Sequence, residues 1–379
     1  MWLLAGCFLM CGLMMASCVW ADASFQSFKR SFVTFLVLIA AVGIAKHWQG
    51  RELLLFVAGL TVSYLLLGIG AEIAQGSFTL SSTHRLAGTQ HPNTQGVNCA
   101  LLALSSLALV ADSHRKRATA MQLVWLSIAS IGIVCLLLTR SRSATVAFAV
   151  ALVVFMFQGA SRNKKVLYGC ALLQLAAIAG VLWCASDSQD GFLSAVKMGR
   201  EQDAAEITTL TGRIPIWGAV LGEVSERPLF GYGYGGFWTS RRVEEFSSLF
   251  NWTFMHSHSA YLETLLNVGI VGLMGGLAVV IGGIIAASNA FRRTGDQGFH
   301  FVTALLVLAL VHGFLDSSFA RDGIETFIGA LAIAVVAFHG VPGAASNLRH
   351  ASKSANRDRQ ANSIQFAIPG PEHAPILNA

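Results

Sequence analysis

Long apolar runs separated by short polar turns set the pattern of this chain. Ten runs come near the roughly 20 residues that a helix needs to cross a bilayer. They fall at about residues 2–20, 31–45, 53–74, 97–111, 120–139, 144–157, 166–185, 261–287, 301–314 and 324–338. The pattern predicts an all-α, polytopic integral membrane protein of about ten transmembrane helices, with one long loop between the seventh and eighth spans.

The same pattern divides the chain into four parts. We expect an N-terminal transmembrane bundle at 1–185, a catalytic loop at 186–258, C-terminal transmembrane helices at 259–340 and a disordered tail at 341–379. The tail is rich in small, polar and charged residues, which is typical of disorder. The first apolar run also fits a cleaved signal peptide, but no basic residues precede it, so we favour a retained span.

Composition supports a membrane protein. Of the 379 residues, 54% are hydrophobic and 12% are charged, whereas soluble domains carry about 25% charged residues. The seven cysteines lie in apolar segments without CxxC spacing. Disulfide and metal sites are therefore both disfavoured.

The distribution of basic residues predicts the orientation. With the N-terminus inside, the inner loops and the tail hold 14 Lys and Arg residues, and the short outer loops hold 6. Because cytoplasmic loops carry the basic excess, we expect both termini in the cytoplasm and the long loop in the periplasm of a bacterial inner membrane. The net charge of +6 is then topological, and no nucleic-acid partner is expected.

Charged residues near the membrane gather at the predicted outer ends of the spans. They are Glu72, Arg140, Arg142, Asp316, Arg321, Asp322 and Glu325. Arg140 and Arg142 share a turn too short to be a separate loop, and paired guanidinium groups suit bidentate phosphate binding. Snorkelling of a span-end arginine to the headgroups is the simpler alternative for each taken alone.

The long loop carries the other candidate groups. Arg213 and Trp217 are four residues apart and so lie on one face of a predicted amphipathic helix. That face offers a guanidinium to phosphate and an indole to a sugar ring, or else anchors the helix at the membrane surface. The Gly- and aromatic-rich segment 228–238 lacks a GK[ST] ending, so it is not a nucleotide-binding loop; it fits a sugar-stacking turn or a tight packed turn.

Two histidines close the long loop. His256 and His258 precede the eighth span, and Tyr261 follows three residues after His258, which predicts that Tyr261 and His258 share a helical face. Histidine is the side chain best suited to accept a proton near neutral pH. An interfacial role is the alternative, and the spacing of the two histidines does not favour a metal site.

The order of these features resembles the O-antigen ligase and polysaccharide polymerase family. The matching elements are SRS at Arg142, TGR at Arg213 with Trp217, a P-x-x-G-x-G-x-G-x-F-W turn, and HSHSAYL before an NVGIVGL span. The closest likeness is to exopolysaccharide polymerases of the succinoglycan type. The likeness extends over about residues 85–273 and includes the GTQHPNTQG segment.

The resemblance implies a membrane glycosyltransferase that uses a polyprenyl-diphosphate-linked glycan as donor, without metal or other cofactor. By the same resemblance, Arg142 and Arg213 hold the diphosphate and His258 acts on the acceptor hydroxyl. Arg140, Trp217, His256 and Tyr261 are expected to contact substrate. The acceptor is a glycan or a lipid A core, membrane lipids surround the protein, and flippase and chain-length regulator proteins are further candidate partners.

Three alternatives remain open from the sequence. A ligase that transfers polysaccharide to lipid A core shares the donor chemistry of a polymerase. A transporter or flippase favours broken helices at the membrane midplane and repeated halves, and we find neither in the sequence. A non-catalytic scaffold would tolerate loss of Arg213 and His258.

Overall fold

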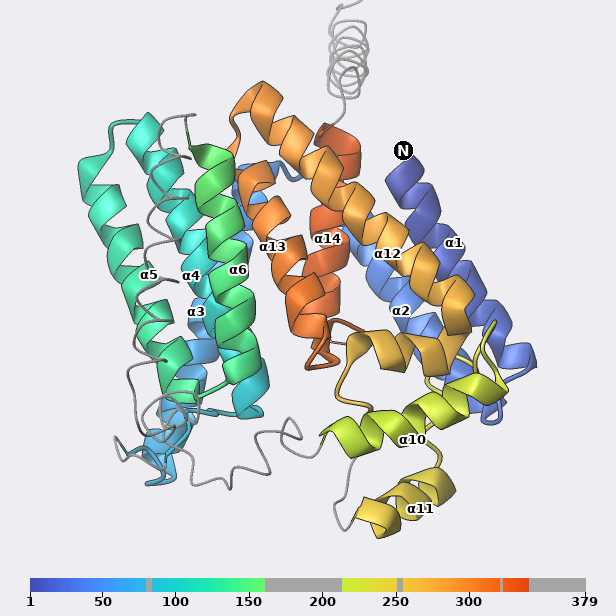
Figure 1. Ribbon diagram of the computed structural model, residues 1–379. Coiled ribbons are helices and arrows are strands. Elements are labelled where there is room, and N and C mark those ends of the chain that lie inside the picture. Colours follow the sequence, from blue (N-terminus) through green and yellow to red (C-terminus); the bar gives the residue numbers. More distant parts are fainter. Residues whose placement is uncertain (80–83, 161–212, 251–254, 321–322, 341–379) are drawn as a thin grey trace, which may run out of the picture. The chain divides into compact units, whose positions relative to one another are not determined.

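The computed structural model describes residues 1–79, 84–160, 213–250, 255–320 and 323–340. Within these ranges the chain is helical and contains no strand, which confirms the all-α prediction (Figure 1). The helices are α1 Trp2–Ala16, α2 Ser24–Ala45, α3 Gly50–Ala74, α4 Pro92–Arg115, α5 Thr119–Thr139, α6 Arg142–Gly159, α10 Arg213–Glu226, α11 Ser240–Phe250, α12 Ala260–Thr294, α13 Gln297–Gly313 and α14 Ile324–His339, with short 3₁₀ turns at Ser17–Val19 and Ser318–Ala320.

Nine of the ten predicted spans coincide with these helices; the span expected at 166–185 lies outside the described residues. Among the described helices, seven are long and apolar enough to cross a bilayer, and α13 and α14 are shorter apolar helices. The chain is therefore a polytopic membrane protein. Its total number of spans, the four-part division and the segments 186–212 and 341–379 remain predictions.

Helix α4 lies at the centre of the bundle. It packs against α3, α5, α6 and α13, and most of its residues are buried. The first turn of α4 leaves few backbone N–H groups without a partner. Pro92 has no backbone N–H, and the His91 side chain accepts the Asn93 N–H at 3.2 Å. By contrast, α5 exposes many large apolar side chains, as expected for a helix that faces lipid.

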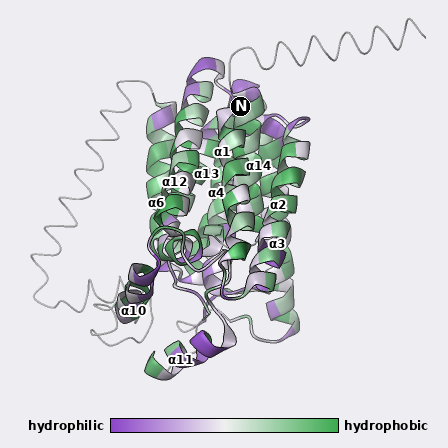
Figure 2. Ribbon diagram, turned by 90° about the vertical axis from the view of Figure 1, so that its right-hand side faces the viewer, coloured by the Kyte–Doolittle hydropathy of each residue, from purple (hydrophilic) through white to green (hydrophobic). Residues whose placement is uncertain are grey.

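The two ends of the bundle carry different groups. At one end, loops expected on the inner side meet: Arg51 pairs with Asp112 at 3.5 Å, and Arg115 donates to the Gly295 carbonyl. At the other end lie α10, α11 and the α5–α6 turn, next to polar loops (Figures 1 and 2). All the candidate functional residues found within the described ranges belong to this second end, which we call the loop end.

A break in α12 connects the membrane helices to the loop end. Gly269 has φ +67° and ψ −167° inside this helix, a conformation that only glycine adopts readily. The free backbone groups around the break are satisfied by the 228–232 turn: the Ile270 N–H donates to the Pro228 carbonyl at 2.9 Å, and the Tyr232 N–H donates to the Leu266 carbonyl at 2.7 Å. The Gly- and aromatic-rich segment is therefore a packed turn that is hydrogen-bonded to α12 on both sides of the break.

A small apolar core holds α10 and α11 against this turn. The buried side chains are Ile216, Val220, Tyr232, Phe237, Trp238, Phe246 and Leu266. Burial of large aromatic side chains is a strong source of stability. The two helices of the long loop are thus fixed relative to α12, the helix that follows the histidines.

Candidate functional site

Arginines from separate elements converge at the loop end. Arg140 is the left-handed cap that ends α5, with φ +51°, and Arg142 is the first residue of α6 after the Ser141 cap. Arg85 precedes α4 and is fixed by two bonds: its Nε donates to the Thr139 carbonyl at 3.2 Å and its Nη2 donates to Asn93 Oδ1 at 3.3 Å. The short α5–α6 turn thus places Arg140 and Arg142 next to the loop that carries Arg85.

The fourth member of this arginine cluster is Arg213, at the start of α10. Its guanidinium donates to the Leu315 carbonyl. Burial lowers the pKa of Arg213, Asp316 opposes that shift, and the positive charge of Arg142 lowers the pKa further. The pKa of Arg85 is also lowered, first by burial and then by Arg142 and Arg140. The arginine cluster therefore shares one electrostatic environment, with Arg142 coupled to both Arg85 and Arg213.

The histidine segment, residues 255–259, adopts a tight conformation before α12. His258 has φ +54°, which is uncommon for a residue with a side chain. Its N–H donates to His256 Nδ1 at 3.2 Å, and the two imidazole rings lie 4.0 Å apart. Because Nδ1 of His256 accepts this bond, a neutral His256 carries its proton on Nε2.

Two neighbours hold this conformation. Glu263 Oε2 accepts both the N–H and the hydroxyl of Ser257 at 3.0 Å. The indole N–H of Trp217 donates to the Ser257 carbonyl at 3.0 Å. Trp217 therefore supports the histidine segment from α10, rather than only anchoring that helix at the membrane surface.

His258 is strongly disfavoured as a cation. Burial, the neighbouring His256 and the positive charge of Arg213 lower its pKa to about 3, with Asp316 acting in the opposite direction. The imidazole is thus neutral at physiological pH and can accept a proton. Because Arg213 couples to His258 and also to Arg142, the structure brings together the three residues that the sequence predicts to be catalytic.

Asp316 and the adjacent Ser317 connect the arginine cluster with the histidine segment. Asn93 Nδ2 lies 3.5 Å from Asp316 Oδ2, while the adjacent Ser317 Oγ lies 3.2 Å from His256 Nδ1. Burial alone would raise the pKa of Asp316, but His312 and two hydrogen bonds donated by Ser318 bring it below its usual value. An ionised carboxylate therefore partly balances the arginine charges.

The structure places Tyr261 differently from the sequence prediction. His258 lies outside the helix, which begins at Ala260, so Tyr261 and His258 do not share a helical face; that prediction was wrong. The Tyr261 hydroxyl donates to the Leu310 carbonyl of α13 at 2.7 Å. Tyr261 joins two membrane helices, and its predicted contact with substrate stays a prediction.

Sequence reasoning did not assign roles to three residues of this site. Arg85 was counted only for topology, and Asp316 only as a charge at an outer span end. Glu263 gave no signal, because its partners Ser257 and Trp238 are identified only by the fold. The signal for Asp316 was its position at the predicted outer end of a span, and the signal for Arg85 was its position in a predicted outer loop.

A family model described as O-antigen ligase matches residues 125–277. This range contains Arg140, Arg142, Arg213 and His258, whereas Arg85 and Asp316 lie outside it. No curated protein matches the chain.

Proposed function

Because the chain belongs to an O-antigen ligase/polymerase-like family, we propose that this membrane glycosyltransferase polymerises polyprenyl-diphosphate-linked oligosaccharide repeats into exopolysaccharide on the periplasmic side. The observation that supports the proposal most directly is the electrostatic coupling of Arg142, Arg213 and His258 at one end of the bundle. Arginine guanidinium groups match the charge and geometry of a diphosphate.

The arginine cluster serves the leaving group. The acceptor hydroxyl oxygen attacks the anomeric carbon of the donor, and the bond between that carbon and the diphosphate oxygen breaks. Both electrons of that bond stay with the diphosphate, so negative charge grows there in the transition state. Arg85 and Arg213 are already held by hydrogen bonds, and preorganised charges of this kind are usually the largest source of rate enhancement.

His258 serves the acceptor. Its neutral imidazole takes the proton that the acceptor hydroxyl loses as the new glycosidic bond forms, and a base in this role contributes roughly 10² to 10⁴ in rate. The free protein holds the pKa of His258 at about 3. Diphosphate binding adds negative charge near Arg213, so it raises this pKa and makes His258 a better base when donor is present. Attack opposite the leaving diphosphate inverts the anomeric configuration.

Purified protein in lipid nanodiscs tests the proposal. With lipid-linked repeats as the substrate, we expect wild-type protein to form longer lipid-linked chains and to release polyprenyl diphosphate. His258→Ala protein that is folded equally well is expected to lose at least about a hundredfold in rate, the lower limit for loss of a general base. Chain growth by the variant at the wild-type rate would remove His258 from the mechanism.

The description of the matching family model supports a second candidate, ligation of polysaccharide to lipid A core. Ligase and polymerase use the same donor site and differ in acceptor. Deletion of the gene separates them: loss of extracellular polymer with intact lipopolysaccharide supports the polymerase, whereas truncated lipopolysaccharide with normal polymer supports the ligase.

A further inference from the structure

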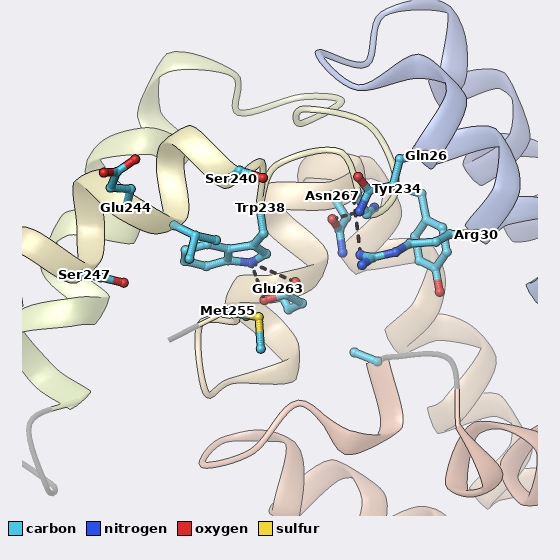
Figure 3. Close-up of a pocket in the computed structure, with 13 residues that line it drawn as sticks. Gln26, Arg30, Tyr234, Trp238, Ser240, Glu244, Ser247, Met255, Glu263 and Asn267 are labelled. Atoms are coloured by element: carbon cyan, nitrogen blue, oxygen red, sulfur yellow. Dashed lines mark hydrogen bonds between the residues drawn. The ribbon is translucent and has the colours of Figure 1, made fainter. Parts of the chain in front are cut away.

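A large cavity opens beside the histidine segment, whose Met255 lines it. Its volume is about 710 Å³, within the range of small-molecule binding sites. The start of α2, the Tyr234–Trp238 turn, α11 and the first turns of α12 surround it (Figure 3). None of the four clustered arginines is among its described lining residues, so this polar cavity is distinct from the donor site proposed above.

Buried polar groups form part of the wall of the polar cavity. Glu263 and Asn267 are only 4% and 5% exposed. Glu263 accepts the Trp238 indole N–H at 3.1 Å, and Asn267 Oδ1 accepts the Gly235 N–H at 2.9 Å. Among the lining residues that the structure describes, Arg30 is the cation, and its side chain lies next to Tyr234 (Figure 3).

This set of side chains suits a saccharide. A sugar ring presents hydroxyl groups at its edge and C–H groups on its faces, so it needs planar polar partners next to aromatic surface. Carboxylate and amide groups supply the planar polar partners, and the amphipathic rings of tryptophan and tyrosine supply the aromatic surface. The arrangement differs from a purely apolar ligand pocket, which lacks such convergent polar groups.

The polar cavity also adjoins the proposed base. Met255, at the start of the histidine segment, lines it, and Glu263 binds the N–H of Ser257 from within its wall. The histidine segment therefore contacts the polar cavity through Met255 and Glu263, and its His258 is coupled electrostatically to Arg213. A saccharide bound in the polar cavity would therefore lie next to the segment that carries the proposed base.

A second, apolar cavity continues toward the membrane helices. It has a volume of about 210 Å³ and shares Tyr234, Asn267 and Ala320 with the polar cavity. Methionines of α1 and the small residues Gly272 and Gly276 of α12 line it. Apolar walls at this position fit part of a hydrocarbon chain.

We propose that the two adjacent cavities bind the acceptor as a lipid-linked saccharide, with its sugars in the polar cavity and the start of its lipid chain in the apolar one. This inference rests on the proposed glycosyltransferase function and assigns the acceptor side of that site. Arg30 is placed to bind the phosphate that links the sugar to the lipid, since Tyr234 next to it lines both cavities.

Filling each cavity separately tests the proposal. Ser247→Trp adds bulk to the polar cavity from α11, and Ser248→Trp is its control because Ser248 is an exposed neighbour that does not line the cavity. Gly276→Leu fills the apolar cavity, and Gly59→Leu on α3 is its control. A side-chain carbon at either glycine meets no atom within 4 Å, so both variants should fold.

The assay measures transfer from a lipid-linked donor whose own acceptor hydroxyl is blocked to a fluorescent lipid-linked acceptor. We expect Ser247→Trp and Gly276→Leu to raise the acceptor KM by about tenfold or more, with the donor KM unchanged and both controls like wild type. The free oligosaccharide should inhibit wild-type and Gly276→Leu proteins equally, and Ser247→Trp protein much less.

Unchanged acceptor KM in both cavity-filling variants would overturn the proposal, as would an equal rise in donor KM. These outcomes differ from failure of the proposed function, in which wild-type protein itself transfers no saccharide. Loss of acceptor binding in Gly276→Leu alone would refute the saccharide assignment of the polar cavity.

Discussion

Donor binding should change the basicity of His258, and this change is measurable. In the free protein the pKa of His258 is lowered to about 3 from the ordinary 6.5. A single negative charge about 5 Å away, at an effective dielectric constant of about 20, contributes about 3 kcal/mol, or roughly two pKa units. Diphosphate on the arginine cluster is therefore expected to raise the pKa of His258 to about 5.

Rates measured across a range of pH reveal the difference in the pKa of His258 between the free and the donor-bound protein. The pH dependence of kcat/KM reports groups of the free enzyme, and that of kcat reports the enzyme with bound substrate. At pH 4 we expect kcat to be about a tenth of its plateau value while kcat/KM stays near its plateau. Coincident acid limbs of kcat and kcat/KM in folded protein would refute the coupling between the diphosphate site and His258.

Arg213→Gln is the variant matched to this measurement. It removes the positive charge that lowers the pKa of His258, so the acid limb of kcat/KM should move to higher pH and approach that of kcat. The stability of the folded protein should be measured over the same pH range as the rates. Because the pKa of His258 is lower in the folded than in the unfolded state, its contribution to stability is complete above pH 6.5 and is lost as the pH falls toward 3.

Three further substitutions test how the fold supports the site. Trp217→Phe removes the 3.0 Å bond to the histidine segment; we expect a loss of about 0.5–1.5 kcal/mol, seen as a lower kcat with unchanged polyprenyl diphosphate affinity. Glu72→Gln removes the charge of a buried carboxylate that accepts two backbone N–H groups of the 84–88 loop at 2.8 and 2.7 Å. It should lower the free energy of unfolding by about 1–2 kcal/mol and raise the donor KM. Gly269→Ala places a methyl group 2.2 Å from the Leu229 carbonyl oxygen, so its unfolding midpoint should fall sharply. In the control Gly276→Ala the methyl group meets no neighbour, so its unfolding midpoint should match that of wild type. Equal stability of these two variants would contradict the described kink.

Much of the fold follows from the apolar pattern alone. Nine runs of apolar residues became helices, because a chain in lipid must satisfy its backbone polar groups within each segment. The break at Gly269 was not predicted, since the segment VGIVGL after Asn267 continues an apolar run. Its cause is the bond pattern of the 228–232 turn, which is far away in sequence.

The candidate site was predictable only in part. Arg142, Arg213 and His258 were identified from the order of motifs, and the fold brings them into one electrostatic environment. Asp316 and Glu263 were not assigned, because their importance comes from contacts across helices. The left-handed conformation of His258 was also missed, since a helical continuation of HSHSAYL looked equally consistent with the sequence.

Equilibrium binding of polyprenyl diphosphate to purified protein in nanodiscs tests the central claim most directly. Charge-assisted hydrogen bonds contribute about 1.5–3 kcal/mol each, so Arg142→Gln and Arg213→Gln should each raise the Kd by about tenfold or more. His258→Gln should leave the Kd within about threefold of wild type, because the proposed mechanism assigns this neutral side chain to the acceptor. Equal affinity in the wild type and both arginine variants would contradict a diphosphate site at the arginine cluster.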